Sequence, residues 1–156
     1  GADLFEKRAR WAEQLGADAG LVVSGDNLVE QVREITRGAM ADVVIVGPGT
    51  SKALATGIAA AGPGATVVQF TATPPDEELP VRPHDLYFNE IKLVPSYSCG
   101  PDDTRVALDL VERGVINARE LVTHRFPLSE ITTAYATAQK PEALKVIVTM
   151  NEGQRT

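Results

Sequence analysis

The sequence of 156 residues has a single cysteine, no excess of basic residues and no long apolar run. Because Cys99 has no second cysteine to pair with, an internal disulfide is excluded, and a cytoplasmic location is expected. The formal net charge of -6 argues against nucleic acid as a partner, since phosphate binding needs a basic surface. No apolar run approaches the roughly 20 residues that cross a bilayer, so no membrane partner is expected.

Motifs for catalysis and phosphate binding are also missing. The sequence contains neither a G-x-S-x-G nucleophile elbow nor a G-x-x-x-x-G-K-[ST] loop. Gly47 and Gly49, like Gly62 and Gly64, form a G-x-G pair, but neither pair has the third glycine of a dinucleotide-binding loop. With one cysteine and two histidines far apart in sequence, no metal site made from this chain alone is expected. These patterns predict no catalytic residue.

Three short apolar runs are present: "GLVVS" (20–24), "DVVIVG" (42–47) and "ATVVQF" (65–70). Each is nearly continuous rather than alternating, which is typical of strands buried on both faces of a parallel sheet. Helices are predicted between them. The first carries a capping box of Asn27 and Glu30, and the second begins at Thr50 or Ser51 and ends at "GPG" (62–64). The alternation predicts an α/β fold with a doubly wound parallel sheet.

The second half of the chain continues this alternation after an exposed connection rich in proline (71–83). The elements predicted there are a strand over 87–98, a helix capped by "PDD" (101–103) and ended by Gly114, a strand over 121–126, a helix over 129–139, a strand over 144–150 and a frayed polar end over 151–156.

Candidate binding residues follow the predicted strands. Asp3 precedes an amphipathic helix, where it either caps that helix or accepts hydrogen bonds from the hydroxyl groups of a nucleotide ribose. "VGPGT" (46–50) and Phe70–Ala72 lie after strands, at the carboxyl ends where ligands bind in open α/β sheets. Tight turns after the strands also explain both segments, and from the residues alone that interpretation is preferred.

Five stretches together resemble one family, the medium-chain dehydrogenase/reductases, in the branch of zinc-type alcohol, sorbitol and threonine dehydrogenases. They occur in family order and cover about residues 2–149. The resemblance implies hydride transfer between an alcohol and NAD, with NAD(P) as the cofactor class. The stretches are "DLFEKRARWAEQLGAD", "VREITRGAMADVVIVGPG", "AAGPGATVVQF", "FNEIKLVPSYSCGPDDTRVALDLVERG" and "LVTHRFPLSEITTAYATAQKPEALKVIV".

The resemblance also implies roles for individual residues. Asp3 would bind the adenosine ribose and favour NAD over NADP, because its carboxylate repels a 2′-phosphate. The strand near 88–94 would pair two copies into a homodimer or build a tetramer. The remaining positions are Arg8 beside the same ribose, Val46, Gly47, Phe70 and Thr71 at the nicotinamide, Ser96 and Tyr97 at its carboxamide, and Lys145 at the pyrophosphate.

Against the family pattern, parts are missing. The domains expected are a truncated NAD-binding Rossmann-type domain (1–114) and a C-terminal strand–helix–strand segment (115–150) that returns to the catalytic domain. The first sheet strand, the glycine loop and the N-terminal domain with its zinc ligands are absent, so the chain is expected to be a C-terminal fragment that is inactive alone.

The missing strand is central in such a sheet, and its absence predicts self-association across the gap or a segment that normally fills it. Two alternatives remain open at this point. One is a truncated, non-catalytic protein that acts in binding or assembly. The other is a zinc-independent reductase of the same superfamily.

Overall fold

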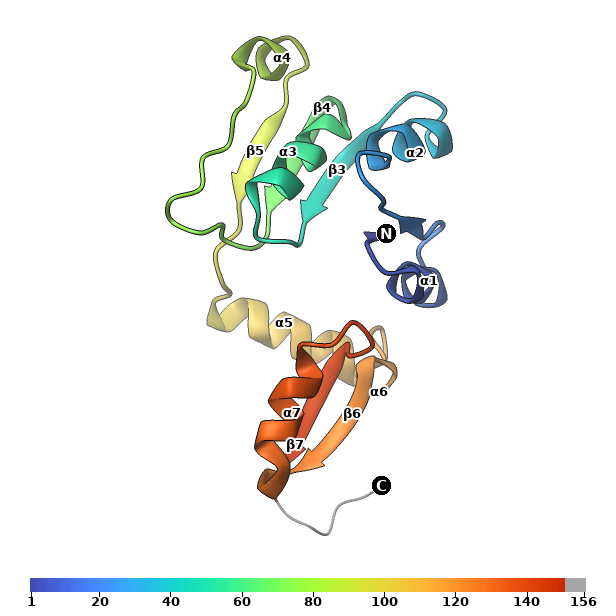
Figure 1. Cartoon of the computed structure of the whole chain (residues 1–156), viewed down its shortest axis with the longest axis vertical. Coiled ribbons are helices and arrows are strands. Elements are labelled where there is room, and N and C mark those ends of the chain that lie inside the picture. Colours follow the sequence, from blue (N-terminus) through green and yellow to red (C-terminus); the bar gives the residue numbers. More distant parts are fainter. Residues whose placement is uncertain (151–156) are drawn as a thin grey trace. The chain divides into compact units, whose positions relative to one another are not determined.

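The computed structural model describes residues 1–150, so the frayed end predicted for 151–156 lies outside the described residues. The chain divides into two compact units, Gly1–Ser98 and Cys99–Thr156. Both contain parallel strands connected by helices (Figure 1). This arrangement confirms the predicted α/β class.

The first unit begins with a small strand–helix–strand element. Strands β1 (Ala2–Asp3) and β2 (Leu21–Val22) pair in parallel, and helix α1 (Glu6–Gln14) connects them. Ala9 of α1 is buried, and a Cβ atom on Gly20 would lie 2.2 Å from the Ala9 carbonyl oxygen. The chain therefore needs glycine where it passes under α1 to enter β2.

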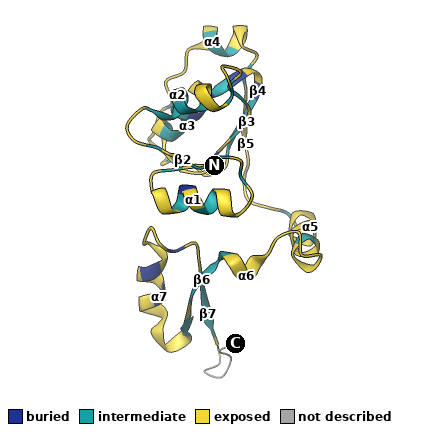
Figure 2. Cartoon of the chain, turned by 90° about the vertical axis from the view of Figure 1, so that its right-hand side faces the viewer, coloured by how far each residue is buried: buried dark blue, intermediate teal, exposed yellow. Residues whose placement is uncertain are grey.

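The larger part of the first unit is a three-stranded parallel sheet in the order β3-β4-β5. Its elements are α2 (Leu28–Ile35), β3 (Ala41–Val46), α3 (Ser51–Ala59), β4 (Ala61–Gln69), α4 (Pro83–Phe88) and β5 (Lys92–Pro95). Helix α3 packs on one face of the sheet and carries buried residues (Figure 2). There Leu54 meets Val46 and the fully buried Val67. Burial of these side chains stabilises the β3–α3–β4 unit.

The opposite face of this sheet is apolar and poorly covered. Side chains alternate along a strand, so Val43 and Ile45 point away from α3, and they are 61% and 67% exposed. Ile45 is in register with Val68 of β4, which is in register with Val94 of β5, and the three form one apolar row. Among the described strands, β3 ends this sheet and no ladder joins it to β1 or β2. The unpaired side of β3 is the position where a further, central strand of a doubly wound sheet is expected.

The second unit contains the strand–helix–strand element that the sequence predicts. Strands β6 (Val122–Pro127) and β7 (Lys145–Thr149) pair in parallel, and helix α7 (Ile131–Ala138) lies between them in sequence. Ala134, Thr137 and Ala143 are its buried residues. Two further helices, α5 (Pro101–Glu112) and α6 (Ala118–Leu121), precede β6, and a short 3-10 turn (Leu128–Glu130) precedes α7.

Several predicted boundaries are wrong. The strand expected over 87–98 is confined to Lys92–Pro95, because residues up to Phe88 form α4, with Pro83 in its first turn. The motif "GPG" does not end α3 but lies inside β4, which begins at Ala61.

The capping box predicted at α2 does not form. The side chain of Asn27 turns back to accept a hydrogen bond from the Ser24 amide, at 2.9 Å, so it makes no bond to the helix. The other caps are closer to the prediction. Thr50 caps α3, and the carboxylate of Asp103 accepts a hydrogen bond from the Gly100 amide at the start of α5, at 2.7 Å.

Candidate functional site

The carboxyl ends of β3, β4 and β5 lie side by side and are joined by two backbone hydrogen bonds. The Phe70 amide donates to the Val46 carbonyl at 3.1 Å, and the Ser96 amide donates to the Gln69 carbonyl at 3.0 Å. The structure therefore brings together six of the residues singled out in the sequence, along one edge of the sheet. They are Val46, Gly47, Phe70, Thr71, Ser96 and Tyr97.

This edge is open on the side of the solvent. Nothing lies within 4 Å of the position that a Cβ atom on Gly47 would take, so a flat ring has room to approach the backbone there. Phe70 and Tyr97 are 62% and 97% exposed. Val46, by contrast, is buried in the core under α3, so it offers backbone rather than side chain to a ligand. The edge thus combines bare backbone with exposed aromatic groups, which suits an aromatic ligand.

The turn between β3 and α3 closes one end of the edge. A Cβ atom on Gly49 would lie 2.4 Å from the Ala72 carbonyl oxygen, so the turn lies directly against the segment that follows β4. The Ser51 amide donates to Glu77 Oε2 at 2.5 Å, and the Ala53 amide donates to Thr50 Oγ1 at 3.2 Å. Sequence reasoning missed Glu77. The acidic run "DEE" (76–78) is visible in the proline-rich connection, but nothing in the sequence pairs it with the helix that begins at Thr50 or Ser51.

Asp3 is the last residue of β1, at the carboxyl end of a parallel strand. Its Oδ1 accepts a hydrogen bond from the Phe5 amide at 2.9 Å, so it supports the first turn of α1. Its Oδ2 lies 4.0 Å from Arg8 Nη1, and both side chains are about one third exposed. Asp3 Oδ2 therefore faces the guanidinium group of Arg8, beside the start of α1.

Lys145 belongs to the second compact unit, where it is the first residue of β7 and is exposed. Its carbonyl accepts a hydrogen bond from Thr123 Oγ1 at 3.3 Å. Its role at a pyrophosphate stays a prediction, as do the roles of Asp3, Arg8 and the six edge residues.

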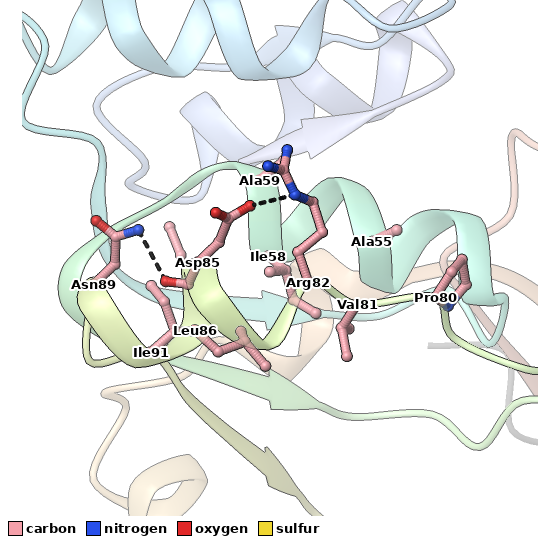
Figure 3. Close-up of a pocket in the computed structure, with 11 residues that line it drawn as sticks. Ala55, Ile58, Ala59, Pro80, Val81, Arg82, Asp85, Leu86, Asn89 and Ile91 are labelled. Carbon is pink, nitrogen blue, oxygen red and sulfur yellow. Dashed lines mark hydrogen bonds and ion pairs between the residues drawn. The ribbon is translucent and has the colours of Figure 1, made fainter.

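A separate hollow of about 320 Å³ lies between α3 and α4 (Figure 3). Ile58, Leu86 and Ile91 form apolar parts of its lining. Its polar groups already bond to one another: Arg82 Nε lies 3.2 Å from Asp85 Oδ2, and Asn89 Nδ2 donates to the Asp85 carbonyl at 2.9 Å. The hollow therefore offers few free polar groups to orient a ligand.

Within residues 1–150, no group of three or more His, Cys, Asp or Glu side chains is arranged to hold a metal ion. No helix in that range combines the length and the apolar character that a membrane crossing requires.

Comparison with known proteins identifies relatives. The model of the family described as zinc-binding dehydrogenase matches residues 1–113. The sorbitol dehydrogenase of Halalkalibacterium halodurans is 34% identical over 145 residues, which are 91% of this chain and 41% of that protein. The chain thus spans less than half the length of this curated relative.

Solved structures share the fold. A protein described as a zinc-binding dehydrogenase from Sinorhizobium meliloti, bound to NADP, matches with a TM-score of 0.85 and 26% identity, over 95% of this chain and 44% of that one. An alcohol dehydrogenase from Escherichia coli, complexed with NADH, matches with a TM-score of 0.84 and 22% identity, over 96% of this chain and 43% of that one. The chain belongs to the zinc-binding dehydrogenase family and corresponds to its C-terminal cofactor-domain part.

Proposed function

We propose that the chain is the cofactor-binding part of an NAD-dependent, zinc-type alcohol or polyol dehydrogenase. The observation that carries this proposal is the row of strand ends joined by the Phe70–Val46 and Ser96–Gln69 hydrogen bonds, with open backbone at Gly47. A nicotinamide ring is flat and aromatic, and it fits such an edge. A bound cofactor would supply the hydride chemistry, as acceptor in the oxidised form (NAD) and as donor in the reduced form (NADH), and the residues of this edge would orient the ring.

The adenosine end of the cofactor is proposed to bind at Asp3. One carboxylate oxygen accepts from the Phe5 amide, and the other, 4.0 Å from Arg8 Nη1, is proposed to accept from ribose hydroxyl groups. The negative charge disfavours a 2′-phosphate, which supports NAD rather than NADP. Of the two similar structures, one contains NADP and the other contains NADH. The proposed preference of this chain for NAD therefore depends on Asp3 itself. Arg8 flanks the same ribose, and Lys145 is proposed to reach the pyrophosphate.

Catalysis is proposed to require more than this chain. In zinc-type dehydrogenases, zinc polarises the oxygen of the alcohol. We propose that the ligands of this zinc lie in the part of the relatives that this chain does not match, since the chain covers 41% of the sorbitol dehydrogenase. The chain alone is therefore expected to bind the cofactor without oxidising an alcohol. The truncated NAD-binding domain is proposed to run to residue 114, and 115–150 to belong to the catalytic-domain side.

Two further proposals concern the setting of the protein. β5 is the last strand of its sheet, and its Leu93 and Val94 are 39% and 43% exposed. We therefore propose that β5 is the edge strand through which two copies pair. The single cysteine supports a cytoplasmic location, where thiols stay reduced.

Titration of the purified chain with NADH, NADPH and ADP-ribose tests the proposed function. NADH and ADP-ribose are expected to bind with micromolar to millimolar affinity, and NADPH more weakly. Incubation with NAD, zinc and a panel of polyols is expected to produce no NADH. The absence of binding by NADH and ADP-ribose at millimolar concentration would reject the cofactor role and favour the non-catalytic alternative, whereas turnover would reject the assignment of catalysis to other parts.

A further inference from the structure

The segment between β4 and α4, drawn as a long loop in Figure 1, is fastened to the start of α3. The Ser51 amide donates to Glu77 Oε2 at 2.5 Å, which joins residues far apart in sequence. We propose that Glu77 is a positioning residue that holds one wall of the nicotinamide site in place. This inference rests on the proposed function, because the wall matters only if a ring binds beside it.

A second contact fastens the same segment close to β4. A Cβ atom on Gly49 would lie 2.4 Å from the Ala72 carbonyl oxygen and 3.0 Å from Thr71 Cγ2, so the turn and residues 71–72 are in direct contact. Glycine at position 49 is thus required by space rather than by backbone conformation. Thr71, a predicted nicotinamide contact, therefore has its position set by the turn that carries Gly47.

The rest of the segment is arranged so that Glu77 can reach α3. The Glu77 amide donates to the Pro74 carbonyl at 3.1 Å, which forms a turn, and Leu79 packs against the core of Val46, Leu54 and Val67. The chain from 71 to 79 is thus held at both ends, by Ala72 against Gly49 and by Leu79 in the core. Glu77 is the polar bond between these two points.

The chemistry of the bond favours this role. The first amide groups of a helix have no partner within the helix and carry partial positive charge, so a carboxylate there is stabilised. The carboxylate of Glu77 accepts a hydrogen bond from the Ser51 amide, and the hydroxyl of Thr50 accepts one from the Ala53 amide. These two acceptors occupy the start of α3, so that helix end is used to fasten the loop.

Loss of the Glu77 bond should loosen the wall at Thr71 and Ala72 without affecting Asp3, which belongs to a different sheet. The expected effect is selective for the nicotinamide end of the cofactor. In Glu77→Ala, NADH is expected to bind roughly three- to tenfold more weakly, which corresponds to the net contribution of one ordinary hydrogen bond, here the bond that holds the wall. ADP-ribose, which lacks nicotinamide, is expected to bind as it does to the unaltered chain.

Three further variants sharpen the test. Glu77→Gln keeps an oxygen that can accept from the Ser51 amide, and it is expected to restore most of the NADH affinity. Glu78→Ala removes a neighbouring carboxylate and is expected to leave both affinities unchanged. Gly49→Ala places a methyl group against the Ala72 carbonyl, and it is expected to reproduce the selective loss of NADH affinity by pushing the wall away.

Amide hydrogen exchange provides a readout without cofactor. The Ser51 amide and the segment 71–79 are expected to exchange faster in Glu77→Ala and at the original rate in Glu77→Gln. Unchanged exchange at Ser51, or an equal loss of NADH and ADP-ribose binding, would overturn the inference. If the unaltered chain binds neither ligand, the proposed function fails and the inference with it. If it binds both and Glu77→Ala binds both equally well, the inference alone fails.

Discussion

Gly57 of α3 faces Val46 of β3 so closely that a Cβ atom on Gly57 would lie 2.5 Å from Val46 Cγ2. Both residues are buried, and Leu54 and Val67 complete the core around them. The helix can approach the sheet this closely only because position 57 has no side chain. The close approach also holds the turn before α3, and hence Gly47, at the end of β3.

The first prediction concerns this contact. In an exposed helix, replacing glycine by alanine usually stabilises the protein, because alanine favours the helical backbone. At Gly57 the methyl group would overlap Val46, so Gly57→Ala is expected to lower the free energy of unfolding by about 1–3 kcal/mol. Urea denaturation followed by circular dichroism measures the change.

A double-mutant cycle provides the control for Gly57. Val46→Ala removes the methyl group that the new Cβ would strike, so Gly57→Ala should cost much less in the Val46→Ala background than alone. Equal costs in the two backgrounds would show that the contact between the two residues does not limit the packing of α3.

The second prediction compares the two faces of the three-stranded sheet. Val67→Ala is expected to lower the free energy of unfolding by about 2 kcal/mol, because Val67 is fully buried and its loss leaves a cavity. Val43→Ala is the matched control, since Val43 is 61% exposed on the uncovered face, and its cost is expected to stay within about 0.5 kcal/mol. Costs of similar size in thermal or urea unfolding would contradict this assignment of the core.

The third prediction concerns the uncovered row of Ile45, Val68 and Val94. Exposed apolar side chains next to the free edge of β3 favour association between copies. Sedimentation velocity is expected to show an average mass that rises with protein concentration. Ile45→Lys is expected to make this rise smaller. Val106→Lys, on α5 of the second unit, is the control and should have no such effect. A chain that stays monomeric at all concentrations would speak against association at this surface.

The fourth prediction concerns cofactor preference. Asp3→Asn keeps an oxygen to accept from the Phe5 amide, so that hydrogen bond is preserved, but it removes the negative charge that faces Arg8. The ratio of NADPH to NADH affinity is expected to rise by about tenfold, because repulsion of the 2′-phosphate is removed. Asp18→Asn, which changes the net charge equally, should leave the ratio near its original value. Competition titration against ADP-ribose measures both affinities.

The sequence predicts β3 and β4 well, because "DVVIVG" and "ATVVQF" are long apolar runs and a clear helix separates them. Their continuous apolar pattern predicts burial on both faces, whereas the structure covers only the α3 face and leaves Val43 and Ile45 exposed. The failures are local. The side chain of Asn27 can accept a hydrogen bond either from an amide in the first turn of α2 or from the Ser24 amide, and it accepts from Ser24. The spacing of Asn27 and Glu30 does not distinguish these two partners. Pro83, in the first turn of α4, was a signal that a strand reading of 87–98 overlooked.

The candidate site was predictable only in part, for a physical reason. Strand ends are visible as the places where apolar runs stop, so Val46, Gly47, Phe70 and Thr71 could be named in advance. Ser96 and Tyr97 lie inside the strand expected over 87–98, and only the family resemblance pointed to them. Glu77 could not be named in advance, because its partner Ser51 is distant in sequence and their bond depends on the path of the loop. The closeness of Gly49 to Ala72 depends on the same path.

The order β3-β4-β5 has a consequence for how the protein is made. Each strand pairs with the one that follows it in the chain, so each pairing closes a loop of moderate length and costs little chain entropy. During synthesis from the amino end, β3 and α3 are available when β4 emerges, and β4 is available when β5 emerges. This sheet can therefore assemble in the order of translation, because β4 and β5 each pair with the strand that was synthesised just before them.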